Sequence, residues 1–459
     1  MPELQPLYTA EEMRAAEARY PNYPDSVPEL MERAGSAVAD LGLARFPDAR
    51  RWTVVCGGGA NGGDGRVAAR LLAAAGRDVL VVDAKAGEHE LGEPEVIVDA
   101  LFGTGFSGAP RPDAADLIER VNAAAARVVA VDLPSGVDAS TGEIAGAAVQ
   151  ADVTVTFHGR KVGLVVAPGR FHTGEVVVAD IGLEPVETEH RLVGVELLQR
   201  VPRRGERDNK YTAGHVLVIG GSPGLTGAPS LAAMAAMRAD AGYVTVAAPE
   251  SALPVLEQRL LEAVKRPLPD ELGDAAVDRV LELAAKASAM ALGPGLGRSD
   301  GARQLVRRVL AEVELPAVVD ADALFELEPG DWPAPRVLTP HEGELARLLG
   351  HEVAAHRLAS VREAVERFRC VVLLKGADTL VAAPGRGVLV SALGLPSLAT
   401  AGTGDVLTGI VAAFLAKGME PQLAAAAAAA AQQRASVEAP QRAGLVASDL
   451  IDALPRALA

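Results

Sequence analysis

The sequence predicts an α/β protein of two domains, the first of them built on a doubly wound parallel sheet. Short runs of valine and isoleucine recur along the chain, each followed by a Gly-rich turn and then an Ala- or Leu-rich stretch. Continuous apolar runs of this kind are typical of parallel strands that are covered on both faces. The pattern restarts near residue 215, after a polar and basic stretch. We therefore expect one domain at residues 1–190 and a second, different one at 191–459.

In the first domain, strands and helices are expected to alternate. A helical segment at residues 10–46 precedes the first strand, and a helix at 66–75 follows the Gly-rich turn after it. The expected strands are residues 52–56, 78–82, 96–98, 128–131, 153–157 and 175–180.

The second domain repeats the alternation with different motifs. Its expected helices are residues 228–241 and 410–417, and the alanine run at 424–431 is expected to be a tightly packed helix because alanine is the best helix former. The expected strands are residues 215–219, 243–247, 289–292, 317–319, 337–338 and 371–374.

The composition excludes several classes of protein. The chain of 459 residues has 60 acidic and 44 basic side chains, a net charge of -16, which disfavours binding to nucleic acid or to an anionic membrane. Two cysteines cannot form a disulfide framework or a cysteine-rich zinc site. We find neither a secretory signal nor an apolar run of the ~18 residues that a spanning helix needs, so we expect a cytoplasmic protein.

The first Gly-rich turn follows residues 52–56. Gly57, Gly59 and Gly62 fit G-x-G-x-x-G, and Asp83 stands 21 residues beyond Gly62, as in dinucleotide-binding folds. Asp64 lies within the turn, however, where its carboxylate would repel a bound pyrophosphate. An ordinary dinucleotide site and a plain turn with an aspartate cap remain alternatives.

Further polar groups follow neighbouring strands. Asp-Ala-Leu-Phe-Gly-Thr-Gly begins at Asp99, and Asp-Leu-Pro-Ser-Gly-Val-Asp begins at Asp132. Ligands bind at the carboxyl ends of the strands in doubly wound folds. The side chains of Asn61, Asp64, Asp99, Asp132 and Ser135 offer hard oxygens there, which suit an alkali or alkaline-earth cation.

These strings, together with Gly-Ala-Asn-Gly-Gly-Asp-Gly at residues 59–65 and Leu-Met-Glu-Arg-Ala-Gly at 30–35, resemble the NAD(P)H-hydrate epimerase family over residues 10–185. The family usually has asparagine where this chain has Ala60. The resemblance implies a Rossmann-like domain that binds K⁺ through Asn61, Asp99 and Ser135. It also implies contacts to a hydrated nicotinamide nucleotide from Asn61, Gly62, Gly63, Asp64, Gly103, Thr104, Gly105, Phe106, Ser107, Gly108, Ala109 and Asp132.

The implied reaction is chemically simple. The substrate carries a hydroxyl on C6, beside the ring nitrogen, whose lone pair can help to expel it. Water can then return to either face of the ring and invert the carbon. The protein must hold the ring, move a proton and stabilise charge, and we expect Asp132 to be the acid/base group.

The second Gly-rich system is Ala-Gly-Thr-Gly-Asp-Val at residues 401–406. Gly402 and Gly404 let backbone amides converge on an anion at a helix start, and Asp405 could take a proton from a hydroxyl there. Lys-Gly-Ala-Asp-Thr at residues 375–379 follows a strand and could contact phosphate. An aspartate that only caps a helix is the alternative, and a P-loop is excluded because its motif is absent.

The pattern resembles the ribokinase-like superfamily. The strings at residues 220–228, 292–297 and 339–344 narrow the resemblance to ADP/ATP-dependent NAD(P)H-hydrate dehydratase over residues 195–455. Residues 208–214 depart from the family's usual motif before its first strand. The resemblance implies a ribokinase-like α/β sandwich, with hydrate contacts from Ala228, Gly297, His341 and Asp405 and adenine-nucleotide contacts from Lys375, Gly376, Ala377, Asp378, Thr379 and Gly404.

In the implied dehydration, Asp405 deprotonates the C6 hydroxyl of the S epimer. That oxygen takes the terminal phosphoryl group of ADP or ATP, with Mg²⁺ neutralising the phosphates, and the ester then leaves with loss of the C5 proton. We expect a bifunctional repair enzyme in which both epimers become usable, and by family analogy a homo-oligomer. The motifs do not decide between ADP and ATP, or between NADH and NADPH hydrate.

Two alternatives remain at the level of sequence. One is a kinase of a small vitamin alcohol with an accessory domain, which would accumulate a phosphorylated product. The other is a ligand- or protein-binding role for the first domain without catalysis.

Overall fold

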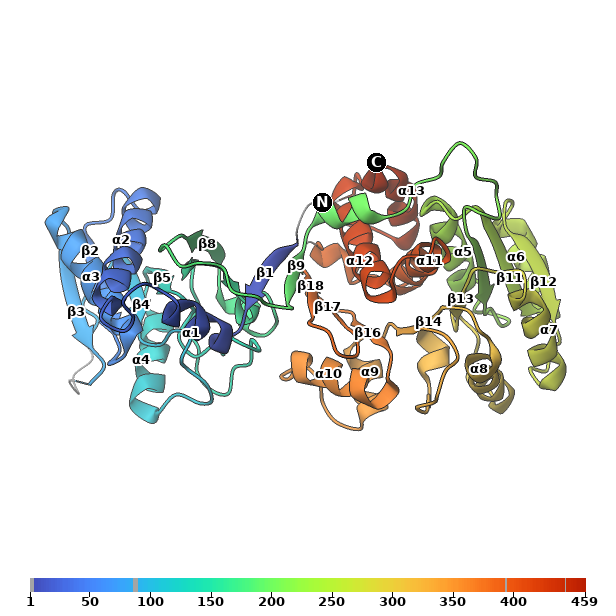
Figure 1. Cartoon of the computed structure of the whole chain (residues 1–459), viewed down its shortest axis with the longest axis horizontal. Coiled ribbons are helices and arrows are strands. Elements are labelled where there is room, and N and C mark those ends of the chain that lie inside the picture. The colour runs from blue at the N-terminus through green and yellow to red at the C-terminus, as the bar shows by residue number, and fades with distance from the viewer. Residues whose placement is uncertain (1–3, 86–89, 393, 442) are drawn as a thin grey trace. The chain divides into compact units, whose positions relative to one another are not determined.

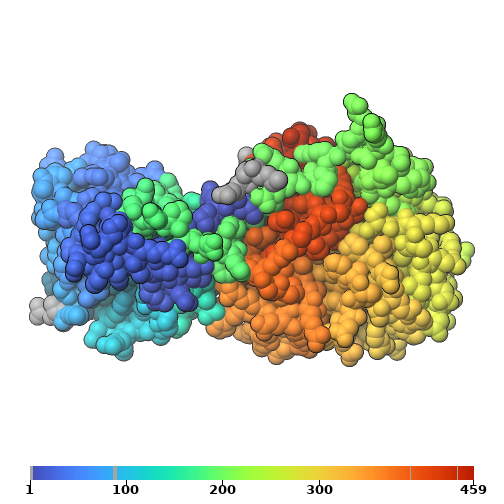
Figure 2. All heavy atoms as spheres, viewed as in Figure 1, coloured from blue at the N-terminus to red at the C-terminus, as the bar shows by residue number. Residues whose placement is uncertain are grey.

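A computed structural model describes residues 4–85, 90–392, 394–441 and 443–459. The chain forms two compact units. The first comprises Pro6–His190 with Ala354–Arg357, and the second comprises Arg191–Val353 and Leu358–Ala459 with the described residues Leu4 and Gln5. Figures 1 and 2 colour the chain from blue at its N-terminus to red at its C-terminus.

The first unit contains a parallel sheet in the order β3-β2-β4-β5-β6-β8. The order reverses between β2 and β4, and in doubly wound sheets ligands bind at the carboxyl ends of the strands at this switch point. β1 and β7 pair in parallel, with Tyr8 opposite Lys161. The strands are β1 (Gln5–Tyr8), β2 (Arg51–Cys56), β3 (Asp78–Asp83), β4 (Val96–Ala100), β5 (Arg127–Val131), β6 (Val153–Phe157), β7 (Arg160–Lys161) and β8 (Glu175–Ala179).

Helices cover both faces of this sheet. α2 (Val27–Arg45) and α3 (Ala60–Ala74) pack with Trp52 and Val54 on one face, and α4 (Pro112–Ala123) packs with Val55 on the other. The prediction of a doubly wound α/β unit is therefore confirmed. The expected helical segment at residues 10–46 is interrupted, because α1 (Ala10–Ala18) ends before Pro21 and Pro24 and α2 begins only after them. Proline lacks an amide donor and disfavours helix in the residue before it.

The helix after the first Gly-rich turn begins at Ala60, six residues before the expected start at 66. The segment that contains Asn61 and Asp64 therefore forms the first turns of α3 and is not a loop. Glycine is required there because a β-carbon on Gly62 would lie 1.9 Å from the carbonyl oxygen of Gly57, and one on Gly65 would lie 2.4 Å from Cβ of Ala100. The close approach places polar side chains of α3 at the ends of β2 and β4.

The sheet of the second unit runs β12-β11-β10-β13-β14-β15-β16-β17-β18-β9. Neighbours are parallel from β12 to β16, whereas β17 is antiparallel to both β16 and β18. The strands are β9 (Arg191–Val193), β10 (His215–Ile219), β11 (Tyr243–Pro249), β12 (Val264–Leu268), β13 (Ala289–Leu292), β14 (Ala317–Val319), β15 (Arg336–Leu338), β16 (Val371–Leu374), β17 (Thr379–Ala382) and β18 (Leu389–Ser391).

A large core joins one group of helices to this sheet. Figure 1 shows α11, α12 and α13 gathered together, and their side chains form one apolar cluster with α5 and the central strands. The predicted alanine helix is confirmed, since residues 424–431 are all buried within α12. The helices are α5 (Gly227–Arg238), α6 (Leu253–Arg259), α7 (Asp274–Ala284), α8 (Asp300–Glu312), α9 (Glu342–Leu349), α10 (Arg357–Phe368), α11 (Thr403–Ala416), α12 (Pro421–Glu438) and α13 (Ala447–Leu458).

Among the described residues, we find no helix whose length and apolar character would let it cross a bilayer.

Candidate active sites

The switch point of the first unit is closely packed around backbone. The amide of Gly57 donates to the carbonyl oxygen of Ala100 at 2.9 Å, and a β-carbon on Gly57 would lie 2.0 Å from the carbonyl oxygen of Leu101. The ends of β2 and β4 are thereby held against each other. The polar side chains that follow these strands converge at this edge of the sheet.

Asp99 and Ser135 form a buried pair at this edge. The Ser135 hydroxyl donates to Oδ1 of Asp99 at 2.6 Å, and the Ser135 amide donates to Oδ2 at 2.8 Å. Burial raises the pKa of Asp99 to about 6, and the hydrogen bonds from Ser135 oppose that rise. Ser135 Oγ also accepts from the amide of Phe102 at 2.9 Å, which ties the loop after β5 to the loop after β4.

Asn61 lies on the first turn of α3, against the loop after β4 that is hydrogen-bonded to Ser135. Its side chain is buried, and its Nδ2 atom has no hydrogen-bond partner among the described residues. Its Oδ1 atom faces the backbone at Gly103, where a β-carbon would lie 3.0 Å away. Asparagine, aspartate and serine oxygens are the donor type that a hard cation prefers. The unpartnered amide and the buried carboxylate are polar groups that a ligand can satisfy.

Asp132 and Lys161 form a buried ion pair. Asp132 follows β5 in a left-handed conformation with φ of 68°, and its Oδ1 accepts from Lys161 Nζ at 2.6 Å. The lysine side chain is fully buried and also donates to Thr156 Oγ1 at 2.9 Å and to the carbonyl oxygen of Phe157 at 2.8 Å. Lys161 was not predicted from the sequence. Its only signal was a lysine in an apolar segment shortly after a buried strand.

Two more carboxyl groups face this ion pair. Burial raises the pKa of Asp64 to about 8, and the charges of Asp132 and Glu17 add to the effect. Burial also raises the pKa of Glu17 on α1, again with a contribution from Asp132. Near neutral pH the site therefore combines a protonated Asp64 with a carboxylate–lysine pair, which is an arrangement for moving protons.

A cleft of about 1320 Å³ continues from this site. The loop at residues 103–109 connects them, because Gly103 lies against Asn61 while Phe106, Ser107 and Ala109 line the cleft. Phe102 and Phe106 stack there with ring centroids 4.5 Å apart. Of the other predicted contact residues of this loop, Gly105 and Gly108 are exposed and Thr104 is partly exposed.

In the second unit, Asp405 lies in the first turn of α11. Gly402 caps this helix with φ of 87°, a conformation that glycine adopts without strain. A β-carbon on Gly404 would lie 3.3 Å from Lys375 Nζ, so the turn and the lysine are close neighbours. Burial raises the pKa of Asp405 to about 7, the charge of Asp320 adds to this, and Lys375 opposes it.

Lys375 and Asp320 form the polar centre beside Asp405. Lys375 Nζ lies 2.8 Å from Oδ1 of Asp320, whose Oδ2 accepts from Thr408 Oγ1 at 2.6 Å. Burial alone would lower the pKa of Lys375, but the neighbouring carboxylates, Asp320 foremost, raise it above the usual value. The ammonium group is therefore charged. Lys375 was predicted from the sequence, whereas Asp320 and Thr408 were not.

The remaining members of the turn after β16 differ in exposure. Gly376 and Ala377 are exposed, whereas Asp378 and Thr379 are buried. The Lys375 amide donates to the carbonyl oxygen of Pro340 at 2.9 Å, so this turn is fixed to the loop that carries His341.

His341 caps α9. Its Nδ1 atom accepts from the amides of Gly343 at 3.0 Å and Glu344 at 3.3 Å, and its own amide donates to Glu344 Oε2 at 2.9 Å. The side chain is 56% exposed, and its Nε2 atom lies 3.6 Å from Glu344 Oε2. The cap gives His341 a structural role, and its predicted contact with the substrate stays a prediction.

Gly297 and Ala228 lie on neighbouring loops. Gly297 has φ of 83°, and its amide donates to Asp322 Oδ2 at 2.9 Å. Ser222, on the loop that leads to Ala228, donates to the carbonyl oxygen of Gly295 at 3.1 Å, which holds the two loops together. Ala228 is partly exposed at the start of α5.

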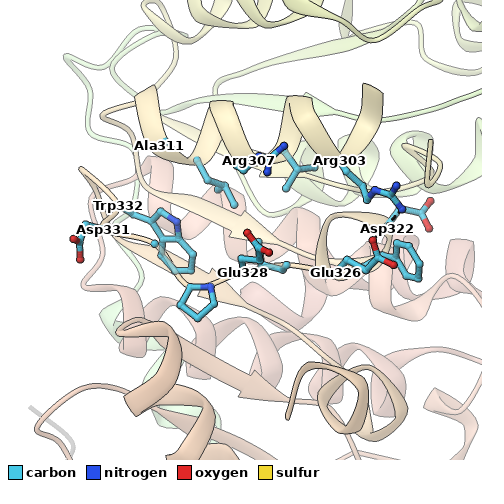
Figure 3. Close-up of a pocket in the computed structure, with 14 residues that line it drawn as sticks. Arg303, Arg307, Ala311, Asp322, Glu326, Glu328, Asp331 and Trp332 are labelled. Atoms are coloured by element: carbon cyan, nitrogen blue, oxygen red, sulfur yellow. Dashed lines mark ion pairs between the residues drawn. The ribbon is translucent and has the colours of Figure 1, made fainter. Parts of the chain in front are cut away.

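A separate, smaller pocket lies between α8 and residues 322–332, as Figure 3 shows. Its volume is about 260 Å³. Arg303 pairs across it with Glu326 at 2.9 Å. Asp322 borders this pocket and also holds the amide of Gly297. Asp405 and Lys375 are not among the residues that line it.

Each of the two units matches a known protein family. Residues 216–456 match the family described as NAD(P)H-hydrate dehydratase, and residues 27–91 and 82–163 match the family described as YjeF-related protein N-terminus. The ADP/ATP-dependent NAD(P)H-hydrate dehydratase of Bacillus subtilis, co-crystallised with ATP and Mg²⁺, aligns with a TM-score of 0.51 at 29% identity, over 57% of this chain and 95% of that chain.

Several relatives match nearly the whole chain, across both units. The bifunctional NAD(P)H-hydrate repair enzyme of Moorella thermoacetica is 40% identical over 94% of this chain and 92% of its own length. The Escherichia coli protein of the same description is 36% identical over 93% of this chain and 89% of its length. The chain therefore belongs to the family of bifunctional NAD(P)H-hydrate repair enzymes.

Proposed function

We propose that this chain repairs hydrated nicotinamide nucleotides in two steps, one in each unit. The unit around Pro6–His190 interconverts the R and S epimers of NADH or NADPH hydrate. The unit around Arg191–Val353 and Leu358–Ala459 dehydrates the S epimer with ADP or ATP. The observation that supports this best is Asp405, which lies with a raised pKa beside a charged lysine and the glycine turn of α11.

Epimerisation needs a proton donor for the departing C6 hydroxyl and a negative charge near the iminium-like ring. Asp64, with a pKa of about 8, is protonated at neutral pH and can give its proton to the hydroxyl as the C6–O bond breaks. Asp132, fixed by Lys161, stabilises the cationic ring and takes the proton of the water that returns to C6. The predicted role of Asp132 is thus shared with Asp64.

Potassium is the cation that we assign to Asn61, Asp99 and Ser135. Their buried side-chain oxygens fit a weakly charged ion with oxygen ligands. The ion would supply fixed positive charge at the carboxyl end of β4. The side chains themselves hold together the loops that follow β4 and β5.

Dehydration begins when Asp405 accepts the proton of the C6 hydroxyl. The hydroxyl oxygen attacks the terminal phosphorus of the nucleotide, the phosphoanhydride bond breaks, and AMP or ADP leaves. Phosphate is a better leaving group than hydroxide, so the C6–O bond breaks, and the departing phosphate takes the C5 proton as the ring double bond forms. The products are NAD(P)H and inorganic phosphate.

The phosphates would lie between the α11 turn and the turn after β16. Lys375 provides positive charge there, and Gly404 lies close to its Nζ atom. Mg²⁺ would arrive with the nucleotide and neutralise its phosphates.

The decisive variant is Asp405→Asn. It should abolish NADH formation and phosphate release from S hydrate with ADP, because the amide cannot take the hydroxyl proton, while the interconversion of epimers continues. Asp300→Asn makes the same chemical change at an exposed side chain and should leave both activities intact. Unaltered dehydration by Asp405→Asn, or a phosphorylated product that accumulates in the unmodified protein, would contradict the proposal.

A further inference from the structure

The cleft beside the epimerase site offers room for the part of the substrate that does not react. If the hydrated ring lies between Asp132 and Asn61, the rest of the dinucleotide must leave along the loop at residues 103–109. That loop runs from Asn61 into the cleft of about 1320 Å³. The residues that line the cleft include Gly57, Gly58, Lys85, Phe106 and Arg111.

Asp83 stands where dinucleotide folds place the acid that binds the adenosine ribose. Here both of its carboxylate oxygens already accept hydrogen bonds. Oδ1 accepts from the amide of Lys85 at 2.9 Å, and Oδ2 accepts from Arg66 Nη2 at 2.6 Å. A ribose hydroxyl would have to compete with a charged arginine for this carboxylate.

The two cations around Asp83 are held close to the Gly-rich turn. Arg66 donates from Nη1 to the carbonyl oxygen of Gly57 at 3.2 Å. A β-carbon on Gly58 would lie 2.3 Å from Cε and 2.6 Å from Nζ of Lys85, so the end of the lysine side chain lies directly over the turn. Lys85 is exposed, and it lines the cleft.

We propose that Lys85, with Arg66 held beside it by Asp83, binds the 2′-phosphate that distinguishes NADPH hydrate from NADH hydrate. This inference rests on the proposed epimerase function. In dinucleotide-binding folds a basic side chain near the ribose acid accommodates this phosphate. Asp83 then positions Arg66 and the backbone of Lys85 rather than binding the ribose itself.

The test compares the two substrates in the full chain, with ADP and ATP left out so that dehydration does not consume the product. The rate of R-to-S conversion is followed by chromatographic separation of the epimers. Lys85→Ala should lower kcat/KM for NADPH hydrate about tenfold, through a higher KM, because a charge-assisted contact to phosphate is lost. It should change the value for NADH hydrate less than twofold.

Two matched variants separate recognition from general charge. Lys85→Arg should retain the preference, and Arg120→Ala, which removes a different cation that lines the same cleft, should affect both substrates alike. Adenosine 2′,5′-bisphosphate should inhibit epimerisation by the unmodified protein more strongly than AMP does, and Lys85→Ala should remove the difference.

Equal losses for both substrates in Lys85→Ala, or no loss for either, would overturn the inference. Failure of the unmodified protein to interconvert the epimers of either substrate would instead contradict the proposed function. The two failures are therefore distinguishable in one experiment.

Discussion

At the scale of single residues, each unit holds a carboxyl group whose pKa is raised by burial and by a neighbouring aspartate that is itself paired with a lysine. In the first unit, Asp64 is kept protonated by burial and by the charge of Asp132, which is paired with Lys161. In the second, Asp405 has a pKa of about 7 because burial and Asp320 outweigh Lys375. Asp64, which must give a proton at neutral pH, thus has the higher pKa of the two. Asp405, which must take a proton, titrates near pH 7.

The pKa of Asp405 predicts how dehydration depends on pH. A base with a pKa of about 7 is protonated below that value, so kcat/KM for S hydrate should fall about tenfold for each pH unit below about 7 and level off above it. Initial rates of NADH formation between pH 5.5 and 9 would measure the profile. A profile that is flat through pH 7 would show that Asp405 does not act as the base.

The residues that carry a motif were predictable, and their partners were not. Asp405 and Asp132 stand next to glycine-containing strings, where both spacing and residue type point to chemistry. Lys161 and Asp320 lie on segments without such strings. They reach the sites only because the sheets place distant strand ends together, 29 residues apart for Asp132 and Lys161 and 55 for Asp320 and Lys375. Their roles as partners follow from the fold.

At the scale of elements, α3 shows what limits prediction from sequence. Three glycines at residues 62, 63 and 65 have low helix propensity, which favoured a loop up to residue 65. The structure has a helix there because the absence of side chains lets α3 approach β2 and β4, and packing outweighs propensity. By contrast, the break between α1 and α2 has a cause in the local sequence, because Pro21 and Pro24 disfavour helix there.

The close approach of α3 predicts the effect of adding one methyl group. Gly62→Ala would place a β-carbon 1.9 Å from the carbonyl oxygen of Gly57, and the backbone there must shift. We expect the first unit to lose about 2 kcal/mol of unfolding free energy, since overpacking outweighs the better helix propensity of alanine. Gly59→Ala, whose β-carbon meets nothing within 4 Å, is the matched control.

The chain has two tryptophans, one in each unit, so the unfolding of the first unit can be measured within the full chain. Trp52 is buried in the first unit, and Trp332 lies in the second. In a Trp332→Phe background, denaturant unfolding followed by tryptophan fluorescence reports the first unit alone. Equal midpoints for Gly62→Ala and Gly59→Ala would contradict the packing argument.

Strands were easier to predict than their order in the sheet. The apolar runs at residues 153–157, 215–219, 289–292, 317–319 and 371–374 are strands with those bounds. The antiparallel strands β17 and β18 were not predicted, and the order β3-β2-β4 of the first sheet depends on crossover connections that apolar patterning does not encode.

At the scale of the whole molecule, the residues proposed for each reaction belong to different units. Asp64, Asp132 and Lys161 lie in the first unit, and Asp320, Lys375 and Asp405 lie in the second. No proposed proton-transfer step borrows a side chain from the other unit. Each reaction should therefore continue when the other is disabled, with the S epimer as the compound they share.

This separation predicts that two disabled chains together repair the R epimer. Lys161→Met should lose epimerisation, because Asp132 loses the buried ammonium group that fixes it, yet should still dehydrate S hydrate. Asp405→Asn should show the reverse. Neither chain alone should convert R hydrate and ADP into NADH faster than the hydrate epimerises without enzyme. An equimolar mixture should do so, since the S epimer diffuses from one chain to the other, and absorbance of the dihydronicotinamide ring follows the reaction. A mixture no faster than its components, with each single activity intact, would mean that the intermediate is not exchanged through solution.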